Sequence, residues 1–156
     1  MGIDRNITET LLGSDFESQH KALQEMGRVY LATAGFDVSA VNEIFDRLNK
    51  NDPLIWKAQY TSPEGEEWGM DTMDAFRCLV DTNRTVRLIN GIFATVSEIK
   101  QRTSRKLKAI DAGTGTGIMA MALAMAGVDK IIALEINPTT AKIDGYPLKC
   151  TKVLYN

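Results

Sequence analysis

The sequence predicts an α/β protein in which a helical N-terminal region precedes the first part of a doubly wound parallel sheet. Two observations carry this prediction. Residues 107–135 read as a strand, a glycine turn, an apolar helix and a second strand, which is the repeating unit of such a sheet. Residues 1–106 instead carry apolar side chains at helical spacing. We therefore divide the chain into a helical N-terminal extension over 1–68, a helical lid or connector over 69–106, and an incomplete cofactor-binding sheet segment over 107–156.

The composition is that of an ordinary globular protein and identifies no partner. Of 156 residues, 44% are hydrophobic and 24% are charged, and the formal net charge of -2 favours neither nucleic acid nor an anionic membrane. No apolar run has the length of a transmembrane span or the form of a signal peptide. The two cysteines, Cys78 and Cys150, match no metal or redox spacing, so we expect reduced thiols in a cytoplasmic protein without a metal site.

The N-terminal extension is expected to hold two helices. Ser14 followed by Glu17 is a capping-box start for the first helix, and Gly35 is placed to end it. Ser39 is the predicted cap of the second helix, which stops at 51–53, where the chain reads Asn-Asp-Pro. A polar turn over 63–67 is the clearest candidate boundary within residues 1–106. The single histidine, His20, falls on the first helix and is predicted to lie at the surface, remote from the chemistry.

The connector reads as helical from Asp71 to about Lys100, with Gly91 as the position where the helix would bend or break. Basic residues gather at its end, where cations favour a helix C-terminus, so a solvated linker is a better interpretation than a nucleic-acid patch. These residues are Lys100, Arg102, Arg105, Lys106 and Lys108.

The third segment changes character at Leu107. Residues 107–112 form a short predicted strand, the apolar run 118–126 a buried helix ended by Gly127, and residues 130–135 a second strand. Asn137 and Pro138 resemble the opening of a further helix.

The glycine turn between the first strand and the helix is the part of the sequence that indicates chemistry. Glycines at 113, 115 and 117 remove side chains and permit positive φ where the chain turns into the helix, so backbone amides can approach a ligand. Dinucleotide-binding loops read Gly-x-Gly-x-x-Gly. Here the third glycine comes one position early, and Ile118 occupies the place of the dinucleotide glycine.

Acidic residues end both predicted strands. Glu135 lies one strand-helix-strand unit after Asp111, and a carboxylate at the end of the second strand can accept both hydroxyl hydrogens of a ribose. Asp111 begins the loop, where it can orient backbone amides or meet a cationic group of a ligand.

The form Asp-x-Gly-x-Gly-x-Gly over 111–117 resembles motif I of class I S-adenosylmethionine-dependent methyltransferases, which have a Rossmann-like sheet. Within that superfamily, residues 117–135 are similar to the protein arginine methyltransferases. A second stretch, 79–85, resembles the helix of that family that carries a Leu-x-Asp-x-x-Arg-Thr run. The family's arginine pairs there with the methionyl carboxylate of the cofactor, and Arg84 is the matching residue; a surface helix pair is the alternative role for Arg84.

The resemblance implies S-adenosyl-L-methionine as cofactor and a methyl acceptor that is a small molecule or a protein arginine, reacting at nitrogen or oxygen. It assigns no catalytic residue. The cofactor-binding residues that it implies are Arg84, Asp111, Ala112, Gly113, Thr114, Gly115, Gly117, Ile118, Glu135 and Ile136.

The sequence also departs from this family. The run from Gly69 to Asp81 is longer than the family's approach to the helix, and the N-terminal aromatic signature is not evident. The sequence ends before the further strands, the adenine-contacting acid and the paired glutamates that the family would supply, so we expect an incomplete chain with little turnover of its own.

Two other functions fit parts of the sequence. A nicotinamide- or flavin-dependent oxidoreductase also uses a glycine turn with a terminal acid, although the glycine spacing here argues against it. A non-catalytic helical interaction module with a vestigial nucleotide fold would explain the long helical leader, and homo-oligomerisation through that leader is possible on the same ground.

Overall fold

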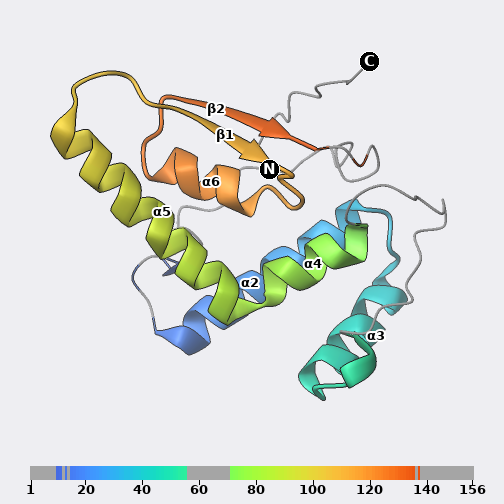
Figure 1. Cartoon of the computed structure of the whole chain (residues 1–156). Helices are drawn as coiled ribbons and strands as arrows, with labels where there is room; N and C mark the ends of the chain where they lie inside the picture. Colours follow the sequence, from blue (N-terminus) through green and yellow to red (C-terminus); the bar gives the residue numbers. More distant parts are fainter. Residues whose placement is uncertain (1–9, 12, 14, 56–70, 136, 138–156) are drawn as a thin grey trace.

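The computed structural model of the chain describes residues 10–11, 13, 15–55, 71–135 and 137. Within this part the structure is α/β, with helices leading into a two-stranded parallel sheet (Figure 1). The elements are α2 (Phe16–Thr33), α3 (Val38–Asn49), a 3-10 helix η1 (Pro53–Ile55), α4 (Thr72–Val80), α5 (Thr82–Arg102), β1 (Lys108–Ala112), α6 (Ile118–Met125) and β2 (Lys130–Leu134). The predicted turn over 63–67, the helix opening at Pro138 and everything predicted beyond it lie outside the described residues.

The strand-helix-strand unit is confirmed. β1 and β2 pair in parallel with Ile110 opposite Ile132, and α6 connects them and packs on one face of the sheet. The other face carries Ile110, which is 65% exposed. The end of α5 joins this unit through the Lys100 ammonium group, which donates a hydrogen bond to the carbonyl oxygen of Ala126 at the C-terminus of α6.

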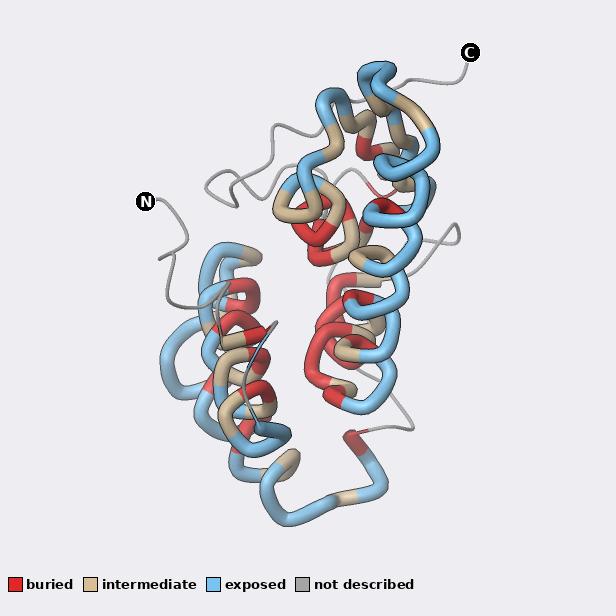
Figure 2. The backbone as a smooth tube through the Cα atoms, turned by 90° about the vertical axis from the view of Figure 1, so that its left-hand side faces the viewer, coloured by how far each residue is buried: buried red, intermediate tan, exposed pale blue. Residues whose placement is uncertain are grey.

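A single hydrophobic cluster joins the helices to the sheet segment. It takes Leu23 from α2, Phe45 from α3, Phe76 from α4 and Met121 from α6, among other buried residues. Phe45 and Phe76 meet edge to face, with ring centroids 5.6 Å apart. Buried stretches lie where helices face one another and exposed ones on the outside (Figure 2). The leader and the glycine loop are therefore stabilised by the same core.

The helix starts differ from the predicted ones. α2 is capped by Asp15, not Ser14, because the Asp15 carboxylate accepts both the backbone N–H of Ser18 at 3.0 Å and the Ser18 hydroxyl at 2.9 Å. These bonds, the backbone N–H first, hold the pKa of Asp15 below its ordinary value. The cap of α3 is Asp37, which accepts the backbone N–H of Ala40, whereas the predicted cap Ser39 lies inside the helix.

The predicted end of α2 is confirmed. Gly35 has φ +93°, and the backbone N–H of Phe36 donates to the carbonyl oxygen of Leu31, which is the six-residue bond of a Schellman motif.

The connector breaks at Asp81 and not at Gly91. Asp81 ends α4 and caps α5, where its carboxylate accepts the backbone N–H of Arg84 at 3.1 Å. Gly91 lies inside an uninterrupted α5, with no neighbouring atom within 4 Å of the place where a Cβ would stand. The cost of a helical glycine, about 1 kcal/mol, is tolerated in a helix that packs against α4 and α6.

The prediction that His20 lies at the surface is wrong. The ring is half-buried because α2 packs against the junction of α4 and α5, and its Nδ1 forms a 2.7 Å hydrogen bond with the hydroxyl of Thr82.

Candidate functional site

The loop between β1 and α6 has the backbone conformation that its glycines predict. Gly113, Gly115 and Gly117 have φ of +73°, +53° and +78°, in the left-handed region that disfavours residues with a side chain. The backbone N–H groups of Gly113 and Thr114 both donate to the carbonyl oxygen of Leu134 at 2.9 Å. The loop is therefore tied to the carboxyl end of β2, which is the edge of a parallel sheet where ligands bind.

The start of α6 is open toward the loop. Gly117 is its N-cap residue and makes no side-chain hydrogen bond to the first turn. Helix N-termini leave backbone N–H groups without intrahelical acceptors and carry a partial positive charge. These groups are available to an electron-rich ligand atom.

Both predicted acids lie at the loop, and both have protein partners. The Asp111 carboxylate accepts the hydroxyl of Thr114 at 2.7 Å. One oxygen of Glu135 accepts the backbone N–H of Gly115 at 2.7 Å, and the other accepts the backbone N–H of Asn137 at 2.9 Å. The Glu135 side chain therefore points toward the loop as expected, and its two bonds hold the loop in place.

Arg84 comes from a different part of the chain and reaches the same place. It lies in the first turn of α5, and its guanidinium donates a 3.3 Å hydrogen bond to the carbonyl oxygen of Cys78. Within the described part of the chain it forms no ion pair with a carboxylate. The alternative of a surface helix pair for Arg84 is thus not seen among these residues.

The loop, α4 and α5 enclose a cavity of about 70 Å³, which we call the glycine-loop pocket. Of the residues predicted to bind a cofactor, Arg84, Asp111, Gly113, Thr114, Gly115 and Ile118 line it. Ala112, Gly117 and Glu135 adjoin the loop without lining the cavity, and Ile136 lies outside the described residues.

One wall of this pocket was not predicted from the sequence. Ala75, Cys78 and Leu79 of α4 line it, and a Cβ at Gly115 would stand 3.5 Å from the Cβ of Ala75. The sequence predicted a helical lid or connector over 69–106, but none of these three side chains was assigned to the site. The sequence feature that could have indicated this wall is that these residues lie shortly before Arg84 in the chain.

Two features are absent from the described residues. They contain no group of three or more His, Cys, Asp or Glu side chains placed to hold a metal ion. None of their helices combines the length and apolar character needed to cross a membrane.

A parallel strand-helix-strand unit with a glycine turn at its carboxyl edge is consistent with part of a Rossmann-like fold. Comparison with known proteins adds a local similarity to methyltransferases. Over 58 residues the chain is 40% identical to protein arginine N-methyltransferase 7 of Mus musculus, and it matches the proteins of that name from Bos taurus and Gallus gallus at the same identity.

This similarity is local. The matched segment is 37% of this chain and 8% of the length of each of these relatives. No protein-family profile matches the chain. No solved structure matches it either.

Proposed function

We propose that this chain binds S-adenosyl-L-methionine at the glycine-loop pocket and contributes this binding site to a methyltransferase. The observation that carries the proposal is that Arg84 and the glycine loop, far apart in the sequence, line one cavity. Each was implicated separately by its resemblance to the same family of enzymes. The local similarity to arginine methyltransferases also supports the proposal.

The residues at the pocket suit the chemical groups of this cofactor. An arginine that forms no ion pair among the described residues offers a bidentate fork to the carboxylate of the methionyl end. Gly113 has no atom within 4 Å of its missing Cβ, so a nucleoside can approach its backbone. Each oxygen of Glu135 accepts one backbone N–H and retains acceptor capacity for a ribose hydroxyl.

The cavity accommodates only part of this cofactor. Ligand pockets usually enclose about 300–1,000 Å³, whereas this one encloses about 70 Å³. We infer that the methionyl end enters the cavity beside Arg84. The nucleoside then lies outside it, over the exposed residues Ala112 and Gly113 and near Glu135.

The reaction that we propose is an in-line displacement at the sulfonium methyl group. A nitrogen or oxygen of the acceptor forms the new bond to the methyl carbon, the carbon–sulfur bond breaks, and S-adenosylhomocysteine leaves. The residues of this chain contribute positioning of the two ends of the cofactor. We assign no general base, and whether the acceptor is a small molecule or a protein arginine stays open.

Calorimetric titration of the full chain with S-adenosylhomocysteine and NAD in parallel, followed by thermal unfolding of each mixture, tests the proposal. At a concentration one hundred times its Kd, a ligand stabilises the native state by about 2.7 kcal/mol, which raises Tm by roughly 5–10 °C for a domain of this size. We expect that shift with S-adenosylhomocysteine and none with NAD. Binding of NAD alone would favour an oxidoreductase, and binding of neither would favour an interaction module.

A further inference from the structure

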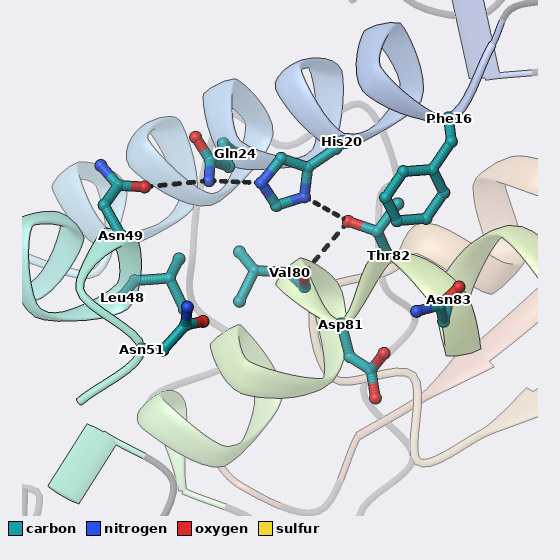
Figure 3. Close-up of a pocket in the computed structure, with 10 residues that line it drawn as sticks. All are labelled: Phe16, His20, Gln24, Leu48, Asn49, Asn51, Val80, Asp81, Thr82 and Asn83. Atoms are coloured by element: carbon teal, nitrogen blue, oxygen red, sulfur yellow. Dashed lines mark hydrogen bonds between the residues drawn. The ribbon is translucent and has the colours of Figure 1, made fainter. Parts of the chain in front are cut away.

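A second and larger pocket lies on the other side of the α4–α5 junction. Its volume is about 640 Å³, within the range of ligand pockets. Residues 80–83 line it from the junction, together with side chains from α2 and from the end of α3, and we call it the polar pocket (Figure 3). Leu79 and Arg84, on either side of 80–83, line the glycine-loop pocket instead.

One wall of the polar pocket is fixed by a chain of hydrogen bonds drawn in Figure 3. The Gln24 amide nitrogen donates to Asn49 Oδ1 at 3.3 Å and to His20 Nε2 at 2.8 Å. Because Nε2 therefore accepts, Nδ1 carries the ring proton and donates to the Thr82 hydroxyl at 2.7 Å. Both nitrogens of His20 are thus engaged, so His20 acts as a structural group of this wall and offers neither a free base nor a metal ligand.

Other polar groups of the pocket keep unused hydrogen-bonding capacity. The side-chain amides of Asn51 and Asn83 form no hydrogen bond with the described residues. The Asp81 carboxylate uses one oxygen to cap α5, and the other has no partner among the described residues. Among the described residues that line the pocket, Asp81 is the one with a carboxylate, and none is a lysine or an arginine. An anionic ligand would meet repulsion there, and a cation would meet attraction.

An aromatic ring at the pocket favours a flat cation. Phe16 lines the pocket and is 53% exposed, an unusual position for a phenylalanine. Its ring is stacked on that of His20, with centroids 6.2 Å apart and an angle of 9° between the planes. A guanidinium stacks on an aromatic face and donates in its own plane to oxygen acceptors.

The same chain already holds a guanidinium in this way. The Arg28 guanidinium lies 4.0 Å from the centroid of the Phe45 ring and donates to the amide oxygen of Asn42 at 3.1 Å. The polar pocket offers the same two groups in Phe16 and Asn83, and adds the Asp81 carboxylate. We propose that the polar pocket binds the guanidinium of an arginine side chain, with Phe16 against its face and Asp81 and Asn83 as acceptors. This site goes beyond cofactor binding and does not depend on it.

Nuclear magnetic resonance titration of the isotope-labelled full chain with a capped Gly-Arg-Gly peptide tests the proposal. The control ligand is capped Gly-citrulline-Gly, which has nearly the same shape and no charge. We expect the arginine peptide to bind at least about tenfold more tightly, because charge-assisted hydrogen bonds are the stronger ones, and to shift the signals of Phe16, Asp81 and Asn83 first. Equal affinity for the two peptides, or shifts confined to other residues, would overturn the proposal.

Substitutions at the polar pocket test whether the arginine peptide binds there. Asp81→Asn removes the charge and keeps a good N-cap for α5, so we expect a folded protein that binds about tenfold more weakly. Phe16→Leu, at an exposed position, is expected to cost about threefold. Asn83→Ala has a matched control in Asn90→Ala, since both side chains are exposed on α5 and Asn90 lines neither pocket. Unchanged affinity in all three pocket variants would refute the site.

A further arm identifies the source of the guanidinium. Propylguanidine carries the same group without a peptide backbone and without a second charge. Tighter binding of the peptide than of propylguanidine would assign the pocket to a polypeptide, and equal binding to a free guanidine; both results support the site. Binding of inorganic phosphate in place of both ligands would contradict the charge argument.

Discussion

Gly115→Val is the substitution that tests the glycine-loop pocket most directly. Gly115 has φ +53°, so a residue with a side chain is strained there, at a cost of roughly 1–3 kcal/mol. The cavity encloses about 70 Å³, room for about two water molecules at some 30 Å³ each. Each methyl group of valine is about as large as a water molecule, so the two of them fill it.

We therefore expect Gly115→Val to fold and to lose S-adenosylhomocysteine binding by at least about a hundredfold, equivalent to about 2.8 kcal/mol. Folding should survive because small domains are stable by about 5–15 kcal/mol. Gly115→Ala separates strain from blocking, since its Cβ would meet Ala75 at an ordinary 3.5 Å and add no further methyl group. We expect it to lose less than about tenfold.

The assay is calorimetric titration, with circular dichroism to show that the helices remain. A folded Gly115→Val protein that binds S-adenosylhomocysteine as tightly as the parent would refute the reasoning, because the ligand would then lie elsewhere. Equal losses for alanine and valine would show that strain in the loop, and not the filled cavity, controls binding.

Three further predictions concern binding and stability. Glu135→Ala should weaken S-adenosylhomocysteine binding by roughly 1–3 kcal/mol in calorimetry, because the Gly115 N–H and the ribose hydroxyls lose their charged acceptor; unchanged binding would remove Glu135 from the site. Arg84→Ala should weaken S-adenosylhomocysteine binding by about 1.5–3 kcal/mol. Binding of methylthioadenosine, which lacks the carboxylate, should stay unchanged. An equal loss for both ligands would contradict the pairing of Arg84 with that carboxylate. Gly27→Ala should destabilise the fold by about 1–3 kcal/mol in urea unfolding, because the new Cβ would stand 2.8 Å from the buried ring of Phe76. Gly91→Ala, in open space, is the control and should stabilise by up to about 1 kcal/mol.

The sheet segment could be predicted because its local sequence determines its backbone. Three glycines at alternate positions allow the chain to turn through positive φ, and an apolar helix between two short strands has few other ways to bury itself. The end of α2 was predictable for the same reason, since Gly35 can adopt the left-handed conformation that a helix end requires.

The junction at Asp81 could not be predicted in this way. No glycine or proline marks it, and the helical pattern of apolar residues runs through it without a change. The break depends on a side-chain hydrogen bond from Arg84 N–H to the Asp81 carboxylate, and on packing of both helices against α2. The predictions of the α2 and α3 caps were wrong for a related reason. Several residues near each helix start can cap a helix, and tertiary packing selects among them.

This break decides the geometry of both pockets. If the helix had continued through Asp81, Arg84 would lie on the same straight axis as Ala75 and would recede from the glycine loop at about 1.5 Å per residue. The turn instead lets Leu79 and Arg84 face one cavity while Val80 and Asn83 face the other. Arg84 is itself held by the turn, since its backbone N–H bonds to Asp81 and its guanidinium to the carbonyl of Cys78. The position of the candidate cofactor-binding arginine is therefore set by a capping carboxylate and not by the glycine loop that it faces.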